Sequence, residues 1–143
     1  MPIPDPEIRL FTAEEANELI PEVIQFLGKL RAQKNKVEKL EDQKAVEQLT
    51  CLQPDGTVGE KAAEAVQRIE RQQMKEARLF TDLLKQISEL GVQIKDLDQG
   101  LVDFFAMRDD ELVMLCWKEG EGKIGYWHDL ESGFAGRRPM EEF

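Results

Sequence analysis

The stretch CLQPDGT, residues 51–57, separates two long segments in which apolar residues recur every three or four positions. Pro54, Asp55 and Gly56 are turn-forming residues, because proline cannot continue a helix and glycine adopts backbone conformations that other residues avoid. The apolar positions run from 23 to 49 before this turn and from 62 to 90 after it. This spacing predicts two helices that pack in opposite directions as a long antiparallel coiled-coil hairpin.

Both arms of the predicted hairpin begin with a helix-capping pattern. Thr12 is followed by Glu15, and Thr57 is followed by Glu60. In a capping box, the threonine hydroxyl and the glutamate carboxylate each accept a hydrogen bond from the other residue's backbone N–H. We therefore expect helices to begin just after Thr12 and just after Thr57.

Pro21 interrupts the first apolar stripe. Proline inside a helix removes a hydrogen bond and clashes with the preceding turn, but it is well tolerated at a first helical position. We therefore expect a short helix at 13–19, followed by a second helix that begins at Pro21. In the predicted register of the hairpin, the polar stretch 33–36 lies opposite 72–75.

After Gly91, which is expected to end the last helix, the pattern changes to short alternating or apolar runs separated by turn residues. Such runs with connections of two to four residues are typical of an antiparallel meander. The apolar run 112–117 indicates a central strand buried on both faces. The predicted strands are 92–96, 101–107, 111–119 and 123–129, with residues 9–11 as a further edge strand.

These elements predict an α+β fold, in which the hairpin packs at its base on a small antiparallel β-meander. We expect one domain, 1–143, that consists of a helical hairpin with a short first helix (12–90) and a β cap with a C-terminal loop (92–139). The middle of the hairpin has a narrow apolar seam. Association of two chains along the arms is therefore expected to bury more apolar surface, and we predict a homodimer.

The composition excludes several classes of function. The net charge is −10, and no segment forms a basic patch, which argues against binding to nucleic acid or to an anionic membrane surface. No apolar run approaches the roughly 20 residues that span a bilayer, and the first residues do not resemble a signal peptide. We therefore expect a cytoplasmic protein.

The two cysteines and the single histidine limit the metal chemistry that the sequence predicts. Cys116 lies in an apolar run and is expected to be buried, whereas Cys51 lies between the helices and is expected to be exposed. One histidine and no paired-cysteine motif argue against a structural zinc site, and the seam lacks the Glu-x-x-His pairs of di-iron bundles. No metal and no cofactor is therefore predicted.

The rare residues gather near the C-terminus, in IGYWHDLESGFAGRRP, residues 124–139. Arginine recognises carboxylate or phosphate, tryptophan offers a flat wall, and histidine exchanges a proton near neutral pH. One interpretation is a site for a small anionic ligand. The other is a structural closure, with the tryptophan in the core, the histidine bonded to the backbone and the arginines paired with acids. The candidate ligand-binding residues are Trp127, His128, Asp129, Arg137, Arg138 and Asp103.

Other arrangements of these residues fit known chemistry less well. Asp96, Asp98, Asp103 and His128 would hold a divalent ion if strands brought them together, but turn acids of this kind are usually solvated. The acidic run does not match an EF-hand, because glycine and the final glutamate are not at the required positions. Ser132 lies near His128 in sequence, but no nucleophile-elbow pattern surrounds it.

Several strings of the chain also resemble a family. RLFTAEEANELIPEV, GVQIKDLDQGLVDF, LCW and WHDLESGFAGRRP resemble, in this order, a family of bacterial and archaeal proteins catalogued as domain of unknown function 2203. The resemblance covers nearly the whole chain except the middle of the hairpin. It implies a shared fold and no established activity.

The sequence thus predicts a non-catalytic cytoplasmic module for interaction or oligomerisation, with a second copy or another protein as partner. The alternative is a small anionic-ligand-binding or hydrolytic domain whose pocket is built from Trp127, His128, Asp129 and the arginines.

Overall fold

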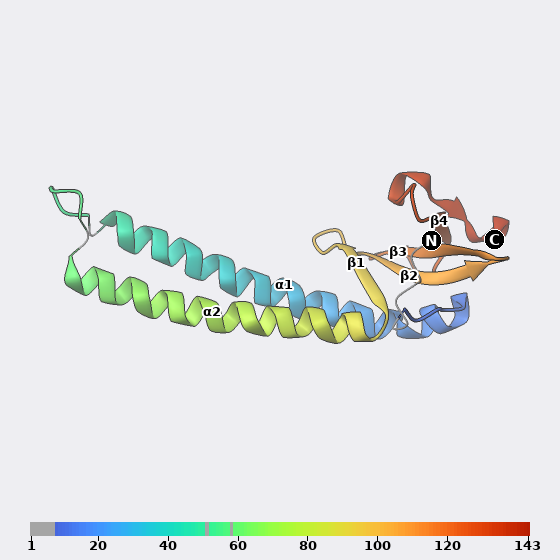
Figure 1. Ribbon diagram of the computed structural model, residues 1–143, viewed down its shortest axis with the longest axis horizontal. Coiled ribbons are helices and arrows are strands. Elements are labelled where there is room, and N and C mark those ends of the chain that lie inside the picture. The colour runs from blue at the N-terminus through green and yellow to red at the C-terminus, as the bar shows by residue number, and fades with distance from the viewer. Residues whose placement is uncertain (1–7, 51, 58) are drawn as a thin grey trace. The chain divides into compact units, whose positions relative to one another are not determined.

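The computed structural model describes residues 8–50, 52–57 and 59–143, so the prediction for Cys51 lies outside the described residues. The chain forms two long helices that pack against each other, followed by an antiparallel sheet, and the α+β class is confirmed. Figure 1 shows the elements in chain order. They are α1 (Ala13–Thr50), α2 (Glu60–Glu89), β1 (Val92–Asp96), β2 (Leu101–Arg108), β3 (Glu111–Lys118), β4 (Tyr126–Asp129), β5 (Arg138–Pro139) and two short 3-10 helices, η1 (Phe134–Gly136) and η2 (Met140–Glu142).

Helix α1 begins with the predicted capping box. The backbone N–H of Glu15 donates to the hydroxyl of Thr12 at 3.1 Å, and the backbone N–H of Thr12 donates to the Glu15 carboxylate at 3.0 Å. The hydrogen bond from the Thr12 backbone is the main reason why the pKa of Glu15 lies below its usual value. The start of α1 is therefore fixed by two side chains that satisfy each other's backbone donors.

The predicted break at Pro21 is wrong, because α1 runs without interruption from Ala13 to Thr50. Pro21 is exposed, whereas Ile20 and Val23 on either side of it are buried in the core. A proline inside a helix costs about 3 kcal/mol, and burying a large aliphatic side chain contributes about 1.5–3 kcal/mol. Packing on both sides of the proline therefore offsets the lost hydrogen bond.

The predicted capping box at Thr57 is also wrong. The backbone N–H of Thr57 donates to the Asp55 carboxylate at 3.0 Å, and its hydroxyl donates to the same carboxylate at 2.6 Å. These bonds close the turn and lower the pKa of Asp55. Helix α2 begins at Glu60, and its first turn closes through a bond from Ala63 N–H to the carbonyl of Gly59. Thr57 is thus hydrogen-bonded to Asp55 within the turn and does not cap α2.

The strands form a single antiparallel meander in the order β1-β2-β3-β4-β5. Strand β3 is the buried central strand that the apolar run predicts. Strand β4 is shorter than expected, and β5, which pairs with it, is not predicted by the sequence. Residues 9–11 do not form the expected edge strand; the N–H of Phe11 donates a single hydrogen bond to the carbonyl of Phe105 at 2.8 Å.

The two faces of the sheet have different roles. Successive residues of a strand point to opposite faces, and we call the face that bears the core the inner face and the other the outer face. On the inner face, the rings of Phe11 and Phe104 meet edge to face at 5.2 Å. The first turns of α1 complete this core, as predicted for the base of the hairpin. Its buried members include Ala16, Val23, Leu27, Val102, Leu115, Trp117 and Trp127.

Residues 29–84 form a compact unit, which we call the arm, separate from the unit formed by residues 8–28 and 85–143. Within the arm, the side-chain amide of Gln33 donates to the carbonyl of Glu76 at 2.8 Å, and Gln73 donates to Glu41 at 2.6 Å. The bond between Gln33 and Glu76 agrees with the predicted register to within about a residue, whereas the bond between Gln73 and Glu41 lies outside the predicted pairing of 33–36 with 72–75. No described helix is both long enough and apolar enough to cross a membrane.

Candidate functional site

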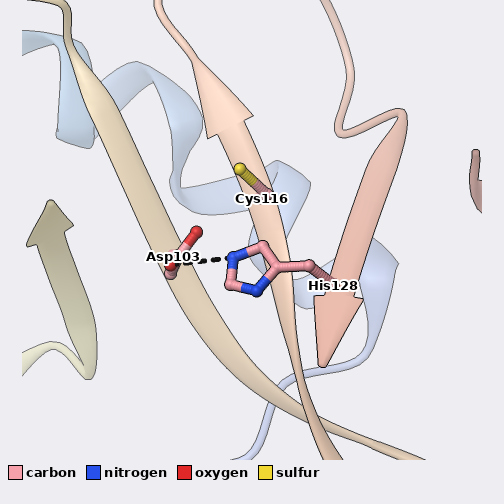
Figure 2. Close-up of side chains that lie close together, drawn as sticks. All are labelled: Asp103, Cys116 and His128. Atoms are coloured by element: carbon pink, nitrogen blue, oxygen red, sulfur yellow. Dashed lines mark hydrogen bonds and ion pairs between the residues drawn. The ribbon is translucent and has the colours of Figure 1, made fainter. Parts of the chain in front are cut away.

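Three neighbouring strands bring Asp103, Cys116 and His128 together on the outer face of the sheet, and we call these residues the outer-face cluster. Asp103 on β2 lies opposite Cys116 on β3. On β4, His128 is two residues beyond Tyr126, the partner of Cys116, so it shares the same face. Figure 2 shows the three side chains pointing toward one another.

The outer-face cluster is almost inaccessible to solvent. The exposed fractions are 2 % for Asp103, 0 % for Cys116 and 3 % for His128. One ligand-type atom from each side chain lies within 4.8 Å of the other two. Buried polar groups of this kind are expensive to place in a sheet unless each has a partner.

Both ring nitrogens of His128 are hydrogen-bonded. Nε2 lies 3.1 Å from Oδ2 of Asp103, and Nδ1 lies 2.6 Å from the backbone carbonyl oxygen of Asp129. Because a carbonyl can only accept, Nδ1 carries a proton. One further proton lies between Nε2 and the Asp103 carboxylate.

Cys116 does not have the environment of a catalytic nucleophile. Burial raises the pKa of its thiol to about 12, and the Asp103 carboxylate adds to the rise. The thiol is therefore protonated at neutral pH, whereas the reactive form of cysteine is the thiolate. Neither nitrogen of His128 is free to accept its proton. A cysteine–histidine mechanism of acyl transfer is therefore not supported.

A pocket of about 310 Å³ lies over the outer-face cluster. All three cluster residues line it, together with apolar outer-face residues such as Phe105 and Met114. Gln93 and Lys95 of β1 and Leu101 of β2 line one side of the pocket. The segment after β4 lines another side through Leu130, Glu131, Gly133 and Phe134.

Asp129 shapes the segment beside the pocket. Its carboxylate accepts hydrogen bonds from the backbone N–H groups of Ser132 at 2.7 Å and Glu131 at 3.0 Å. The bond from Ser132 is the main reason why the pKa of Asp129 lies below its usual value. Gly136 lies against Ser132, and a side chain at this glycine would collide with the serine. The Asp129 carboxylate thus holds a turn, whereas the prediction made it a ligand contact.

Trp127 lies on the inner face, opposite to His128. Its ring meets Phe143 edge to face at 5.8 Å and is flanked by the guanidinium groups of Arg108 at 4.6 Å and Arg138 at 5.2 Å. Trp127 and Arg138 therefore do not line the pocket over the outer-face cluster.

Arg137 is engaged by a neighbouring acid. Its Nη2 lies 2.7 Å from both carboxylate oxygens of Glu121, and its guanidinium covers the rings of Tyr126 at 3.9 Å and Phe134 at 4.7 Å. The positive charge is therefore compensated within the protein. For Arg137, this arrangement matches the structural interpretation of the C-terminal motif, in which the arginines pair with acids.

Of the six predicted ligand-binding residues, the structure brings Asp103 and His128 together in one pocket. Of the acids considered for a divalent ion, Asp96 accepts a hydrogen bond from the backbone of Gln99 at 3.0 Å and so holds a turn. Cys116 was correctly expected to be buried, but its position beside His128 was missed. Only the register of β3 against its neighbours, which the sequence does not reveal, brings the thiol to this place.

A model of one protein family matches residues 9–140 and is described as an uncharacterised conserved protein, DUF2203. This chain belongs to the DUF2203 family. The residues that match the family model include the whole arm and the outer-face cluster of the sheet. Comparisons with curated proteins and with solved structures found no match.

The arm of this DUF2203 protein carries two shallow grooves of opposite charge. The first, of about 330 Å³, lies along α2 and combines exposed apolar side chains with basic ones; we call it the basic groove. It is lined by Arg71, Met74, Lys75, Arg78, Leu79 and Asp82. The second, of about 450 Å³, is the acidic groove, and it is lined by Asp42, Gln43, Val46, Glu47 and Ile69.

Proposed function

We propose that this DUF2203 protein is a non-catalytic module that associates with a second copy of itself through the arm. The observation that carries the proposal is the poor burial within the arm. Among its described residues, the buried side chains are the apolar Leu30, Ala62 and Val66 and the polar Gln33. Helices in proteins owe most of their stability to packing of an apolar face, and three such side chains are few for two helices of this length.

Apolar side chains that the arm does not bury are available to a partner. Met74 is 65 % exposed, Leu79 45 % and Val46 59 %. Complete burial of a side chain of this size contributes about 1.5–3 kcal/mol. A partner that covers these positions would therefore supply the stabilisation that the arm lacks alone.

Charge supports a second copy as that partner. The basic groove has three cations and one acid, whereas the acidic groove has two acids and no cation. In a dimer with two-fold symmetry, each contact between unlike surfaces occurs twice. The basic groove of one chain would meet the acidic groove of the other, and the same pairing would be repeated at the symmetry-related position.

The first experiment compares Met74→Glu with Leu52→Glu by size-exclusion chromatography and light scattering of the full chain. Leu52 is 56 % exposed and lies outside both grooves, so it is a matched control for the added charge. We expect the wild type and Leu52→Glu to be dimers, and Met74→Glu to weaken dimerisation by at least about tenfold, because it removes an apolar contact and places a carboxylate opposite the acidic groove of the second copy. A monomeric wild type, or equal masses for the two variants, would contradict the proposal.

The alternative, a small anionic-ligand or hydrolytic site, has less support. Arg137 is already paired with Glu121, and Arg138 lies over Trp127. The pocket over the outer-face cluster therefore contains neither of the arginines that would hold an anion.

A further inference from the structure

We propose that the outer-face cluster binds a divalent transition-metal ion of the zinc type through Asp103, Cys116 and His128. The inference concerns the sheet and does not depend on self-association of the arm. The proposed site differs from a structural zinc site with four protein ligands, which the single histidine and the lack of a paired-cysteine motif argue against. Here one ligand comes from each of three strands, and the fourth coordination position has no protein ligand among the described residues.

The donor set suits such an ion. A carboxylate oxygen, a thiolate sulfur and an imidazole nitrogen are the three ligand types of protein zinc sites, and the thiolate disfavours Mg²⁺ and Ca²⁺. Zinc bonds of about 2.0–2.3 Å place the ligand atoms of a tetrahedral site roughly 3.3–3.7 Å apart. The donor atoms of the outer-face cluster already lie within 4.8 Å of one another, so small side-chain rotations are sufficient.

The backbone holds His128 in the tautomer that a metal requires. Its Nδ1–H donates to the carbonyl of Asp129 at 2.6 Å, which leaves Nε2 as the atom that faces Asp103. Metal-binding histidines almost always donate their second ring N–H to a carbonyl or carboxylate in this way, which fixes the ring and makes the ligating nitrogen more basic.

Asp103 supplies a second, independent observation. Its Oδ1 is buried and has no hydrogen-bond partner among the described residues, and the whole side chain is 2 % exposed. A buried carboxylate oxygen without a partner is costly. A cation at the centre of the outer-face cluster would compensate the carboxylate charge and remove this cost.

Binding would displace two protons, one from the Cys116 thiol and one from between His128 and Asp103. A coordinating thiol is deprotonated by the metal itself, so the protonated state of Cys116 in the free protein does not prevent binding. All three ligands line the same pocket, so the remaining coordination position opens toward it. That position would be filled by water or by a polar group of a molecule in the pocket.

The test titrates the full-length, chelator-treated protein with Co²⁺ and records absorption spectra. We expect one Co²⁺ per chain with a thiolate-to-cobalt charge-transfer band and tetrahedral d–d bands, both removed by Zn²⁺ and unaffected by Mg²⁺. Cys51→Ala, which removes the other thiol of the chain, should retain the charge-transfer band. Cys116→Ala should lose it.

Asp103→Asn provides a second variant, because the amide preserves shape and hydrogen bonding but is a poor metal ligand. It should weaken Co²⁺ binding by at least about tenfold. Circular dichroism establishes that each variant is folded. The proposal would be overturned if the folded wild type showed no charge-transfer band, if Cys51→Ala abolished the band, or if Asp103→Asn bound Co²⁺ as tightly as the wild type.

Discussion

Asp103 and His128 are two ionisable side chains that would each be unfavourable in the sheet without the other. Their contact of 3.1 Å and the bond from His128 to a backbone carbonyl engage both ring nitrogens of His128 and one carboxylate oxygen of Asp103. Removing one member of a buried pair leaves the other without compensation, which is more damaging than the pair is stabilising.

Stability measurements on the metal-free protein should therefore distinguish two substitutions at the same position. Asp103→Ala leaves His128 unpaired and should lower the free energy of unfolding by about 3 kcal/mol. In Asp103→Asn the side-chain amide N–H can donate a hydrogen bond to Nε2 of the ring, so this substitution should cost less, about 1 kcal/mol. Urea denaturation of both variants measures the difference. Equal losses would show that the pair is not what holds His128 in place.

Residue patterns predicted some of this site, because a lone histidine beside tryptophan and arginine is conspicuous in an acidic chain. They placed Trp127 and His128 in one candidate site, but alternation along β4 sends these side chains to opposite faces. The neighbours of His128 depend on strand register, and register is set by the whole sheet. Cys116 was missed for this reason.

Among the elements, α1 shows how packing overrides a local signal. The sequence predicts a break at Pro21, but α1 is continuous there. The capping box at Thr12 and the turn at 54–56 were predicted correctly. Strand β5 could not be predicted, because it has two residues, one of them proline, and no alternation. Short elements of this kind form only when a neighbouring strand is already in place.

The account of α1 makes a prediction for Pro21. Because the residue is exposed and lies inside a continuous helix, Pro21→Ala restores a backbone N–H donor without changing the core. We expect the free energy of unfolding to rise by about 1–3 kcal/mol. Thermal and urea unfolding monitored by circular dichroism give the value. A loss of stability would mean that the proline constrains the helix in a way that packing alone does not explain.

At the scale of the whole molecule, apolar burial is divided unequally. The unit that contains the sheet holds nearly all of the buried apolar side chains among the described residues, whereas the arm holds three. The sequence predicted this difference from the narrow apolar seam in the middle of the hairpin. It could not identify the two grooves, because each depends on which side chains the packed helices leave outside.

The most direct test of self-association reverses the charge of each groove in a separate variant of the full chain. One variant, Arg71→Glu with Arg78→Glu, makes both grooves acidic, and the other, Asp42→Lys with Glu47→Lys, makes both basic. Like charges would then face each other in each homodimer, whereas a mixed dimer would again pair opposite charges.

Sedimentation equilibrium of the two variants, alone and mixed, measures the outcome. We expect each variant alone to have the mass of one chain, and an equimolar mixture to have the mass of two. Dimers of either variant alone, or a mixture that stays monomeric, would contradict pairing of the basic groove with the acidic groove of a second copy.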